Sequence, residues 1–183
     1  MEEIVMAGRT RALVGKQVRL RRFRAADLPS VIRWRRDPEL RHGTLWGDEV
    51  FGAREARRWL RTVSSSAEFS RITLAIEQRE PARLVGLTNL TRIDRGAGTA
   101  YFGIVIGEKD CWGRGIAGES LGLMLGRAAA LGLRKVLLEV AADNPRAVEL
   151  YKRTGFQVEG VLRRQVARPD GFVDVIVMAC FLA

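Results

Sequence analysis

The chain has few of the residues from which metal centres and disulfide-rich folds are built. Among its 183 residues there is one histidine, His42, and there are two cysteines, Cys111 and Cys180. A single histidine argues against a histidine-based metal site, and the two cysteines match no metal-binding or redox spacing. We therefore expect no metal, no disulfide and a reducing, cytoplasmic location.

Long apolar runs are also missing. No stretch approaches the roughly 20 apolar residues that cross a bilayer, so we expect no membrane partner. Residues 1–5 (MEEIV) are acidic at their start and lack the apolar stretch of a signal peptide. A chain of 183 residues with 47% hydrophobic residues fits one domain with a full core. We expect an N-terminal tail over 1–15 and a single domain over 16–183.

Acidic residues are in deficit, which gives a formal net charge of +10. Residues 1–61 hold 15 Arg and Lys against 8 Asp and Glu, so most of the excess lies there. The positive electrostatic field of such a segment attracts acidic partners, including nucleic acid, the ribosome or anionic substrates. The alternative is a soluble, arginine-rich surface, which is favoured because acids such as Asp37 and Glu55 interrupt the basic residues.

Hydrophobic periodicity predicts a mixed α/β domain. Asp27 is the expected N-cap of a helix over 28–36, which Asp37-Pro38 ends. Gly103, inside an apolar strand, predicts a bulge or a close backbone approach. Val85, Leu87 and Asn89 are expected on one face of their strand. The further expected strands span 17–23, 71–76, 84–90, 99–106, 135–140, 161–168 and 172–182, the further helices span 49–63, 116–131 and 145–153, and Asp170-Gly171 is the expected turn of the last hairpin.

A glycine-rich turn, residues 111–118 (CWGRGIAG), lies between the strand 99–106 and the helix that begins near Ile116. Unpaired amides and the helix dipole at such a position suit a phosphate group. Gly113, Gly115 and Gly118 have the spacing of the dinucleotide fingerprint, with Glu139 where a ribose-binding acid would lie. The same glycine-rich residues could also bind the pyrophosphate of acetyl-CoA.

Three observations count against the dinucleotide interpretation. Residues 107–112 separate the strand from the first glycine, which should follow its strand almost at once. Four predicted strands precede the turn without the alternating helices of a doubly wound sheet. Only 65 residues follow Gly118, too few for the rest of a nucleotide-binding domain.

A second motif decides between the two. Residues 144–156 (NPRAVELYKRTGF) and residues 112–117 (WGRGIA) together resemble the GNAT superfamily of acyl-CoA N-acyltransferases, whose motifs are N-x-x-A-x-x-L-Y-x-x-x-G-F and Q/R-x-x-G-x-G/A. Trp112 departs from the first position of the loop motif, and this is similar to the RimJ/RimL-type branch of ribosomal-protein alanine and spermidine N-acetyltransferases. The resemblance covers about residues 16–182.

The resemblance implies the GNAT fold, an α/β (mixed α+β) domain. Its central sheet is mostly antiparallel, with six to seven strands and about four flanking helices. The sheet is splayed between its fourth and fifth strands, here 99–106 and 135–140. Acetyl-CoA is the implied co-substrate, held along this splay, and no metal is required.

The resemblance also implies which residues bind the co-substrate. The amides of residues 112–117 would donate to the pyrophosphate, Arg114 would add a charged contact, and main-chain groups of residues 104–106 would run beside the pantetheine arm. Asn144 is a good helix N-cap and is also the family's contact to the cofactor; both roles are open. The implied cofactor-binding residues are Ile104, Val105, Ile106, Trp112, Gly113, Arg114, Gly115, Ile116, Ala117 and Asn144.

Tyr151 is the implied catalytic residue, a general acid that protonates the departing thiolate. The alternative is a core tyrosine. Many relatives place an acid where this chain has Tyr101, which leaves the general base unassigned. The remaining candidates are Glu108, Asp94, Glu77, His42 and a water relay.

The predicted reaction is transfer of acetyl from acetyl-CoA to a primary amine by direct attack in a ternary complex. The acceptor is a protein N-terminus or a small amine, and the basic N-terminal half weighs against polyamines. Two other classes stay open: an acyl-CoA-binding regulatory module, and a basic protein that binds nucleic acid or the ribosome. Monomer and homodimer both remain open.

Overall fold

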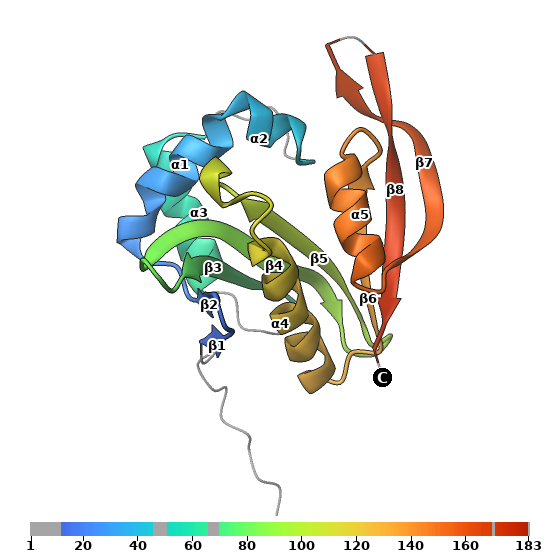
Figure 1. The fold of residues 1–183 in the computed structure, drawn as a ribbon, viewed down its shortest axis with the longest axis horizontal. Helices are drawn as coiled ribbons and strands as arrows, with labels where there is room; N and C mark the ends of the chain where they lie inside the picture. Colours follow the sequence, from blue (N-terminus) through green and yellow to red (C-terminus); the bar gives the residue numbers. More distant parts are fainter. Residues whose placement is uncertain (1–11, 46–50, 66–69, 170, 183) are drawn as a thin grey trace, which may run out of the picture.

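A computed structural model describes residues 12–45, 51–65, 70–169 and 171–182. Within these ranges the strands form one eight-stranded sheet in the order β1-β2-β3-β4-β5-β6-β8-β7 (Figure 1). Every neighbouring pair is antiparallel except β5 with β6. The strands are β1 (Leu13–Val14), β2 (Val18–Arg21), β3 (Ile72–Gln78), β4 (Arg83–Asp94), β5 (Thr99–Ile106), β6 (Lys135–Ala141), β7 (Gln157–Arg168) and β8 (Gly171–Phe181).

The described ranges contain five α-helices: α1 (Leu28–Arg36), α2 (Pro38–His42), α3 (Ala53–Ser65), α4 (Ile116–Ala130) and α5 (Pro145–Arg153). Two short 3₁₀ turns, η1 (Ala25–Asp27) and η2 (Lys109–Cys111), precede α1 and the glycine turn. The predicted mixed fold with a mostly antiparallel sheet is confirmed. The described ranges hold eight strands, where six to seven were expected, and five α-helices, where about four were expected. None of these helices is long and apolar enough to cross a membrane.

Two cores lie on opposite faces of the sheet because side chains alternate along each strand. On β3, Leu74 and Ile76 join the core beneath α4, whereas Ala75 joins the core beneath α1 and α3. Leu87 on β4 also faces α1 and α3. The expectation that Val85 shares its face is wrong, since a bulge opposite Ile76 and Glu77 turns Val85 toward α4.

Three further sequence expectations need correction. The Asp37-Pro38 pair ends α1, but it also starts α2, because the Asp37 carboxylate accepts from the amides of Glu39 (2.9 Å) and Leu40 (3.2 Å). The helix predicted over 49–63 begins at Ala53; its first two predicted residues lie outside the described ranges, as does Asp170 of the predicted hairpin turn. Gly103 makes no bulge: a Cβ there would lie 2.9 Å from the Asn89 side chain, and the nearby irregularity of the β4–β5 ladder falls between Thr91 and Asp94.

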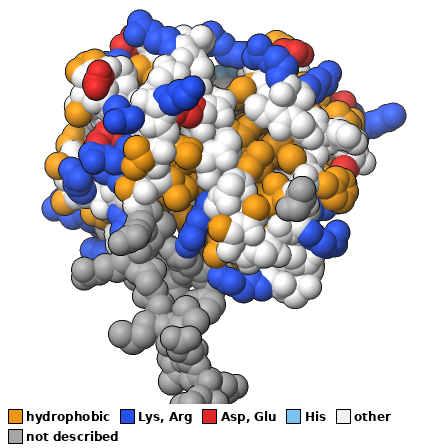
Figure 2. All heavy atoms as spheres, turned by 60° about the horizontal axis from the view of Figure 1, so that its bottom comes forward, with side chains coloured by type: hydrophobic (Ala, Val, Ile, Leu, Met, Phe, Trp, Pro, Cys, Tyr) orange, Lys and Arg blue, Asp and Glu red, His pale blue; other side chains and the backbone are white. Residues whose placement is uncertain are grey.

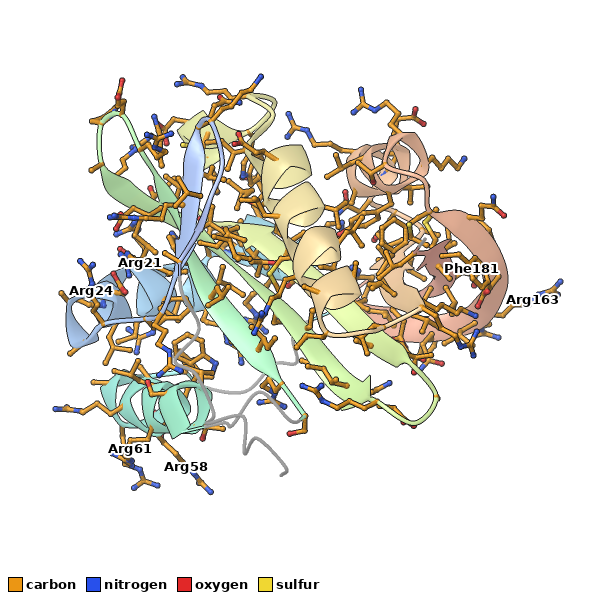
Figure 3. All side chains as sticks on the ribbon, turned by 90° about the horizontal axis from the view of Figure 1, so that it is seen from below. Arg21, Arg24, Arg58, Arg61, Arg163 and Phe181 are labelled. Atoms are coloured by element: carbon orange, nitrogen blue, oxygen red, sulfur yellow. The ribbon has the colours of Figure 1, made fainter. Side chains whose placement is uncertain are left out.

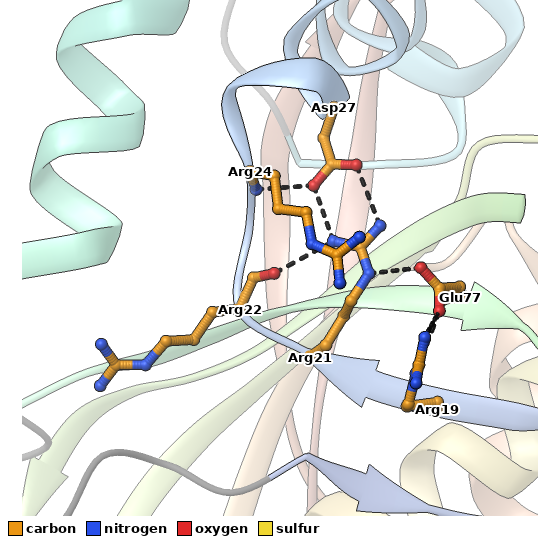
Figure 4. Close-up of polar contacts among 6 residues, drawn as sticks. All are labelled: Arg19, Arg21, Arg22, Arg24, Asp27 and Glu77. Atoms are coloured by element: carbon orange, nitrogen blue, oxygen red, sulfur yellow. Dashed lines mark hydrogen bonds and ion pairs between the residues drawn. The ribbon is translucent and has the colours of Figure 1, made fainter.

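The Asp27 side chain does not cap α1, because its carboxylate binds the buried guanidinium of Arg21 (Figure 4). Arg21 donates to both carboxylate oxygens of Asp27, at 2.8 and 3.0 Å, and a further bond comes from the Arg24 amide (2.7 Å). Arg21 also donates to Glu77, which a second arginine, Arg19, contacts from the other side. Burial alone would raise the pKa of Glu77, but the two guanidinium groups lower it overall. This cluster fastens β2 and η1 to β3.

The sheet opens between β5 and β6. These two strands pair only over Thr99–Tyr101 and Lys135–Leu137, and beyond that point each continues without the other as its neighbour. Strand β6 keeps its partner β8 along its whole length. The splay expected between these two strands is therefore present, and it lies beside the N-terminal end of α4 and beside α5 (Figure 1).

We expect Arg21→Met to lower the free energy of unfolding by about 3–5 kcal/mol, because it leaves the carboxylates of Asp27 and Glu77 buried without their central cation. Urea or guanidinium denaturation measures the loss. The matched control is Arg22→Met, at an exposed neighbouring position, which should change stability by less than about 0.5 kcal/mol. Equal effects of the two variants would contradict a structural role for this cluster.

Candidate active site

The main chain of β5 offers free hydrogen-bonding groups to the splay at alternate residues. The Gly107 amide donates to Val85 O (2.8 Å), and Gly103 O accepts from Thr88 Oγ1 (3.0 Å), so the N–H and C=O groups of odd-numbered residues point toward β4. The N–H and C=O groups of even-numbered residues point toward the splay, because their direction alternates along a strand. The main-chain groups of Ile104 and Ile106 therefore point to the splay, and those of Val105 point to β4. Contact of these three residues with a cofactor stays a prediction.

The glycine turn supplies a row of unpaired amides next to the splay. Gly113 and Gly115 have φ angles of +76° and +82°, a backbone conformation that glycine adopts without strain. Gly115 is the N-cap of α4. Among the described residues, none accepts a hydrogen bond from the amides of residues 113–118. Six free donors at the positive end of a 15-residue helix suit an anion such as a phosphate.

Trp112 does not belong to this row of donors. Its amide donates to Lys109 O (3.1 Å), and its indole Nε1 donates to Ile106 O (2.8 Å). The prediction that the Trp112 amide is a free donor is therefore wrong, because η2 already uses it. Its ring instead ties the turn to the end of β5.

One arginine lies within the turn and a second lies beside it. Arg114, predicted from the sequence, is exposed. Arg146 was not predicted; it lies in the first turn of α5 with its guanidinium 5.4 Å from the Trp112 ring centroid. A Cβ on Gly113 would be 3.6 Å from the same guanidinium. The sequence gives no sign of this approach, since 33 positions of chain separate the two residues.

Asn144 is the N-cap of α5 and also ties that helix to α2. Its Oδ1 accepts from the Ala147 amide (3.2 Å), which confirms the predicted cap, and its Nδ2 donates to Gly43 O (2.9 Å). Nearby, Arg168 donates to His42 O (2.8 Å) and pairs with Asp143 (3.2 Å). The C-terminal end of α2 is thus held against the start of α5. Contact of Asn144 with a cofactor stays a prediction.

Tyr151 combines a buried ring with an unused hydroxyl. The side chain packs against Phe102 of β5 (ring centroids 6.4 Å apart) and Phe156 (5.8 Å), as the core interpretation predicts. Its catalytic role stays a prediction. The hydroxyl makes no hydrogen bond to a described residue, yet it is not among the fully buried polar atoms that lack a partner. Burial raises the pKa of Tyr151 to about 12, so the phenol keeps its proton at neutral pH.

The four candidate bases all have other partners. Glu77 belongs to the buried arginine cluster. Glu108 accepts from Trp34 Nε1 (3.0 Å) and pairs with Arg33. Asp94 accepts from the Ala97 amide of its own turn (2.8 Å), and His42 Nε2 lies 3.4 Å from Asp143.

A cavity of about 230 Å³ lies on the other face of the sheet, beneath α1 and α3. Sequence reasoning missed it, although Asn89, a polar residue that alternates with Leu87, was a signal. The residues that line it are Val31, Arg35, Phe51, Trp59, Arg71, Thr73, Leu87, Asn89 and Thr91.

The basic residues form no continuous patch on the face drawn in Figure 2. Lys and Arg side chains are scattered there, acidic ones are fewer, and apolar areas lie between them. This distribution agrees with a dispersed, arginine-rich surface.

Comparison with known proteins gives a consistent picture. A model of the acetyltransferase (GNAT) domain family matches residues 17–157. The spermidine N(1)-acetyltransferase of Vibrio cholerae serotype O1 is 38% identical over 93 residues, which is 50% of this chain and 53% of that protein. The ribosomal-protein-serine acetyltransferase of Escherichia coli K12 is 30% identical over 93 residues, which is 50% of this chain and 51% of that protein. The matches thus span about half the length of these curated relatives.

Solved structures share the fold over nearly the whole chain. The ribosomal L7/L12 alpha-N-protein acetyltransferase RimL, in complex with coenzyme A, has a TM-score of 0.82 at 18% identity, covering 94% of this chain and 98% of that one. The spermidine N-acetyltransferase of Vibrio cholerae, in complex with CoA and spermine, has a TM-score of 0.79 at 25% identity, with coverages of 90% and 95%.

We expect Asn144→Ala to cost about 1 kcal/mol of stability, because it removes the cap of α5. Asn144→Asp should retain most of that stability, since its carboxylate can still accept from the Ala147 amide, while losing the donation to Gly43 O. Hydrogen exchange at α2 and α5, together with thermal unfolding, separates the two effects. Equal loss in both variants would mean that the tie to Gly43, and not the cap, carries the stability.

Proposed function

Because this chain belongs to the GNAT acetyltransferase family, we propose that it transfers an acetyl group from acetyl-CoA to a primary amine. One observation carries the proposal: the free amides of residues 113–118 lie at the N-terminus of α4, beside the opening between β5 and β6. An anionic pyrophosphate fits the amides, and an extended, amide-bearing arm fits the unpaired edge of β5.

The residues present suit acetyl-CoA, which supplies an acetyl group activated as a thioester. The amides from Gly113 to Ala117 would hold the pyrophosphate, with Arg114 and Arg146 adding charge. The main chain of Ile104 and the amide of Ile106 would lie beside the pantetheine arm. The carbonyl oxygen of Ile106 already accepts a hydrogen bond from the Trp112 indole. The Asn144 side chain already accepts from the Ala147 amide and donates to Gly43 O. It would contact the cofactor only through its remaining N–H group and oxygen lone pair.

In the proposed reaction the amine nitrogen attacks the thioester carbonyl carbon in a ternary complex. The new C–N bond forms, the C–S bond breaks, and the electron pair leaves with sulfur. An amide of β5 that faces the splay would polarise the carbonyl oxygen. The Tyr151 hydroxyl would donate its proton to the departing thiolate. Since the candidate bases have other partners, we assign removal of the amine proton to water.

The acceptor classes of the relatives differ, and both are candidates here: a protein N-terminus, as on a ribosomal protein, or a small amine. Association with the ribosome is a further candidate that the net positive charge allows, although the basic side chains are scattered on the face in Figure 2. The free thiols of Cys111 and Cys180 fit a cytoplasmic enzyme. Sedimentation of the purified chain distinguishes monomer from homodimer. An acyl-CoA-binding module without turnover would bind acetyl-CoA and release no thiol with any amine.

We expect Tyr151→Phe to lower kcat by about 10²–10⁴-fold, because it removes the general acid and little else. The dissociation constant for CoA and the thermal stability should stay close to those of the parent chain. Thiol release from acetyl-CoA measures kcat, and Tyr101→Phe, which alters the other tyrosine of the chain, is the control. A Tyr151→Phe variant with full kcat would eliminate the acid role.

We expect Gly115→Ala to weaken CoA binding by about 5- to 30-fold, which corresponds to the ~1–2 kcal/mol that a left-handed backbone costs an alanine. The strain is relieved when the turn shifts, and the shift disperses the amides. Calorimetric titration with CoA measures the change. The control is Gly122→Ala on α4, where a Cβ meets open space; it should leave CoA affinity intact and add about 0.5–1 kcal/mol of stability. Unchanged affinity in Gly115→Ala would remove the turn from the binding site.

A further inference from the structure

A second hollow, which we call the outer groove, lies between α1 and α3 and has a volume of about 500 Å³. Its described lining contains no strand residue, whereas the cavity beneath the same two helices is lined partly by the sheet. The groove therefore opens on the outer side of the helix pair. The residues that line it are Ala25, Leu28, Pro29, Ile32, Ala53, Arg57, Leu60 and Arg61.

The floor of the outer groove is apolar and reaches the surface. Leu28 and Ile32 lie one turn apart on α1, and Leu60 comes from α3. All three pack against the core beneath the two helices, yet each stays partly exposed. A partner that covers these side chains would remove apolar surface from water, which favours association.

The charged side chains of the lining are both arginines. Arg57 and Arg61 lie one turn apart on α3 and are exposed. Arg57 Nε donates to Ala53 O of its own helix (3.3 Å). In the described ranges neither guanidinium forms an ion pair. The wall that α3 contributes is therefore positive and open to a carboxylate.

The surroundings add to this positive charge. Arg24 directly precedes Ala25 of the lining, and its side chain is exposed at the start of α1 (Figure 3). The acid of α3, Glu55, pairs with its neighbour Arg54 (3.6 Å) and accepts from the Gly52 amide (3.1 Å). No Asp or Glu is among the described residues that line the groove.

We propose that the outer groove docks an amphipathic helix with acidic flanks, carried by a partner protein. The α3 wall spans eight residue steps, from Ala53 to Arg61, or about 12 Å at 1.5 Å per residue. An amphipathic helix that binds through positions i, i+4 and i+7 presents anchors over about 10.5 Å. Its apolar anchors would cover the floor, and its carboxylates would meet Arg57 and Arg61. This docking goes beyond acetyl transfer and does not depend on it.

Two other occupants suit the groove less. A nucleic acid would leave the apolar floor uncovered, and the described lining has no aromatic side chain on which a base could stack. A second copy of this chain would bring another molecule of net charge +10 to a positive wall, and like charges repel. An acidic helix satisfies both the floor and the wall.

The experiment uses three labelled, N-terminally acetylated synthetic peptides of about 16 residues, or ~24 Å of helix. The acidic peptide has Leu at the anchor positions and Glu on both flanks. The second replaces each Glu by Lys, and the third keeps Glu but replaces each Leu by Ser. Fluorescence anisotropy with the full chain measures each dissociation constant. We expect the acidic peptide to bind at least tenfold more tightly than either of the others.

Two variants test the groove, and two others serve as controls. Ala53→Glu places a carboxylate in the groove at an exposed first-turn position, where an acid suits the helix dipole. Arg61→Glu reverses one charge of the wall. Each should weaken binding of the acidic peptide at least tenfold.

The control Arg58→Glu makes the same charge change on α3 outside the lining, and Arg163→Glu makes it on β7, at the opposite edge of the molecule in Figure 3. Both should weaken binding by less than about threefold at physiological salt, where charges are screened over about 8 Å. Thermal unfolding shows that each variant is folded.

Four results would overturn the proposal. The serine peptide binds as tightly as the acidic one, which leaves the floor without a role. Arg61→Glu and Arg58→Glu weaken binding equally, which reflects a general field. Duplex RNA binds in an Arg61-dependent way while the acidic peptide does not bind. Sedimentation shows self-association that Ala53→Glu abolishes, which makes a second copy the occupant. Because the binding assays contain no acetyl-CoA, their result and that of thiol release are independent.

Discussion

The separation of β5 from β6 is the constraint on which the rest of the structure depends. The two strands share only three paired residues on each side, and the main chain of β5 then loses one of its two neighbours. An unpaired strand edge is a ready partner for any extended chain that carries amides. The packing of Tyr151 against Phe102 and Phe156 fills the side of the opening where α5 lies. Strand β6 keeps β8 as its neighbour on the opposite edge along its whole length.

The excess positive charge of the chain serves different purposes at different places. Arg21 is structural, since it is buried between Asp27 and Glu77 and fastens β2 to β3. Arg114 lies within the glycine turn, Arg146 lies beside it, and Arg35 and Arg71 line the cavity on the opposite face. Net charge alone cannot distinguish these roles, because the burial and the partners of each guanidinium decide which one it has.

Features that depend on neighbours in sequence were predicted well. The end of α1, the bounds of α5 and the start of α4 follow from capping and helix-ending residues and from apolar spacing, which act within a few residues. The cap by Asn144 and the glycine turn before Ile116 belong to this group. Asp27 was misassigned because its strongest partner, Arg21, lies on another element. Helix α2 was missed because Asp37-Pro38 both ends one helix and starts the next.

The sequence by itself determined the α/β order, the position of the glycine turn before α4 and the residues 144–156 that mark the family. These are local patterns, in which residue type and spacing are sufficient. Only the tertiary structure decided that the main-chain groups of Val105 point to β4 and that Arg146 reaches the glycine turn. It also brought Arg35 and Arg71 to one cavity. The physical reason is the same in each case: which hydrogen-bonding groups and charges remain free depends on what distant segments pack against them.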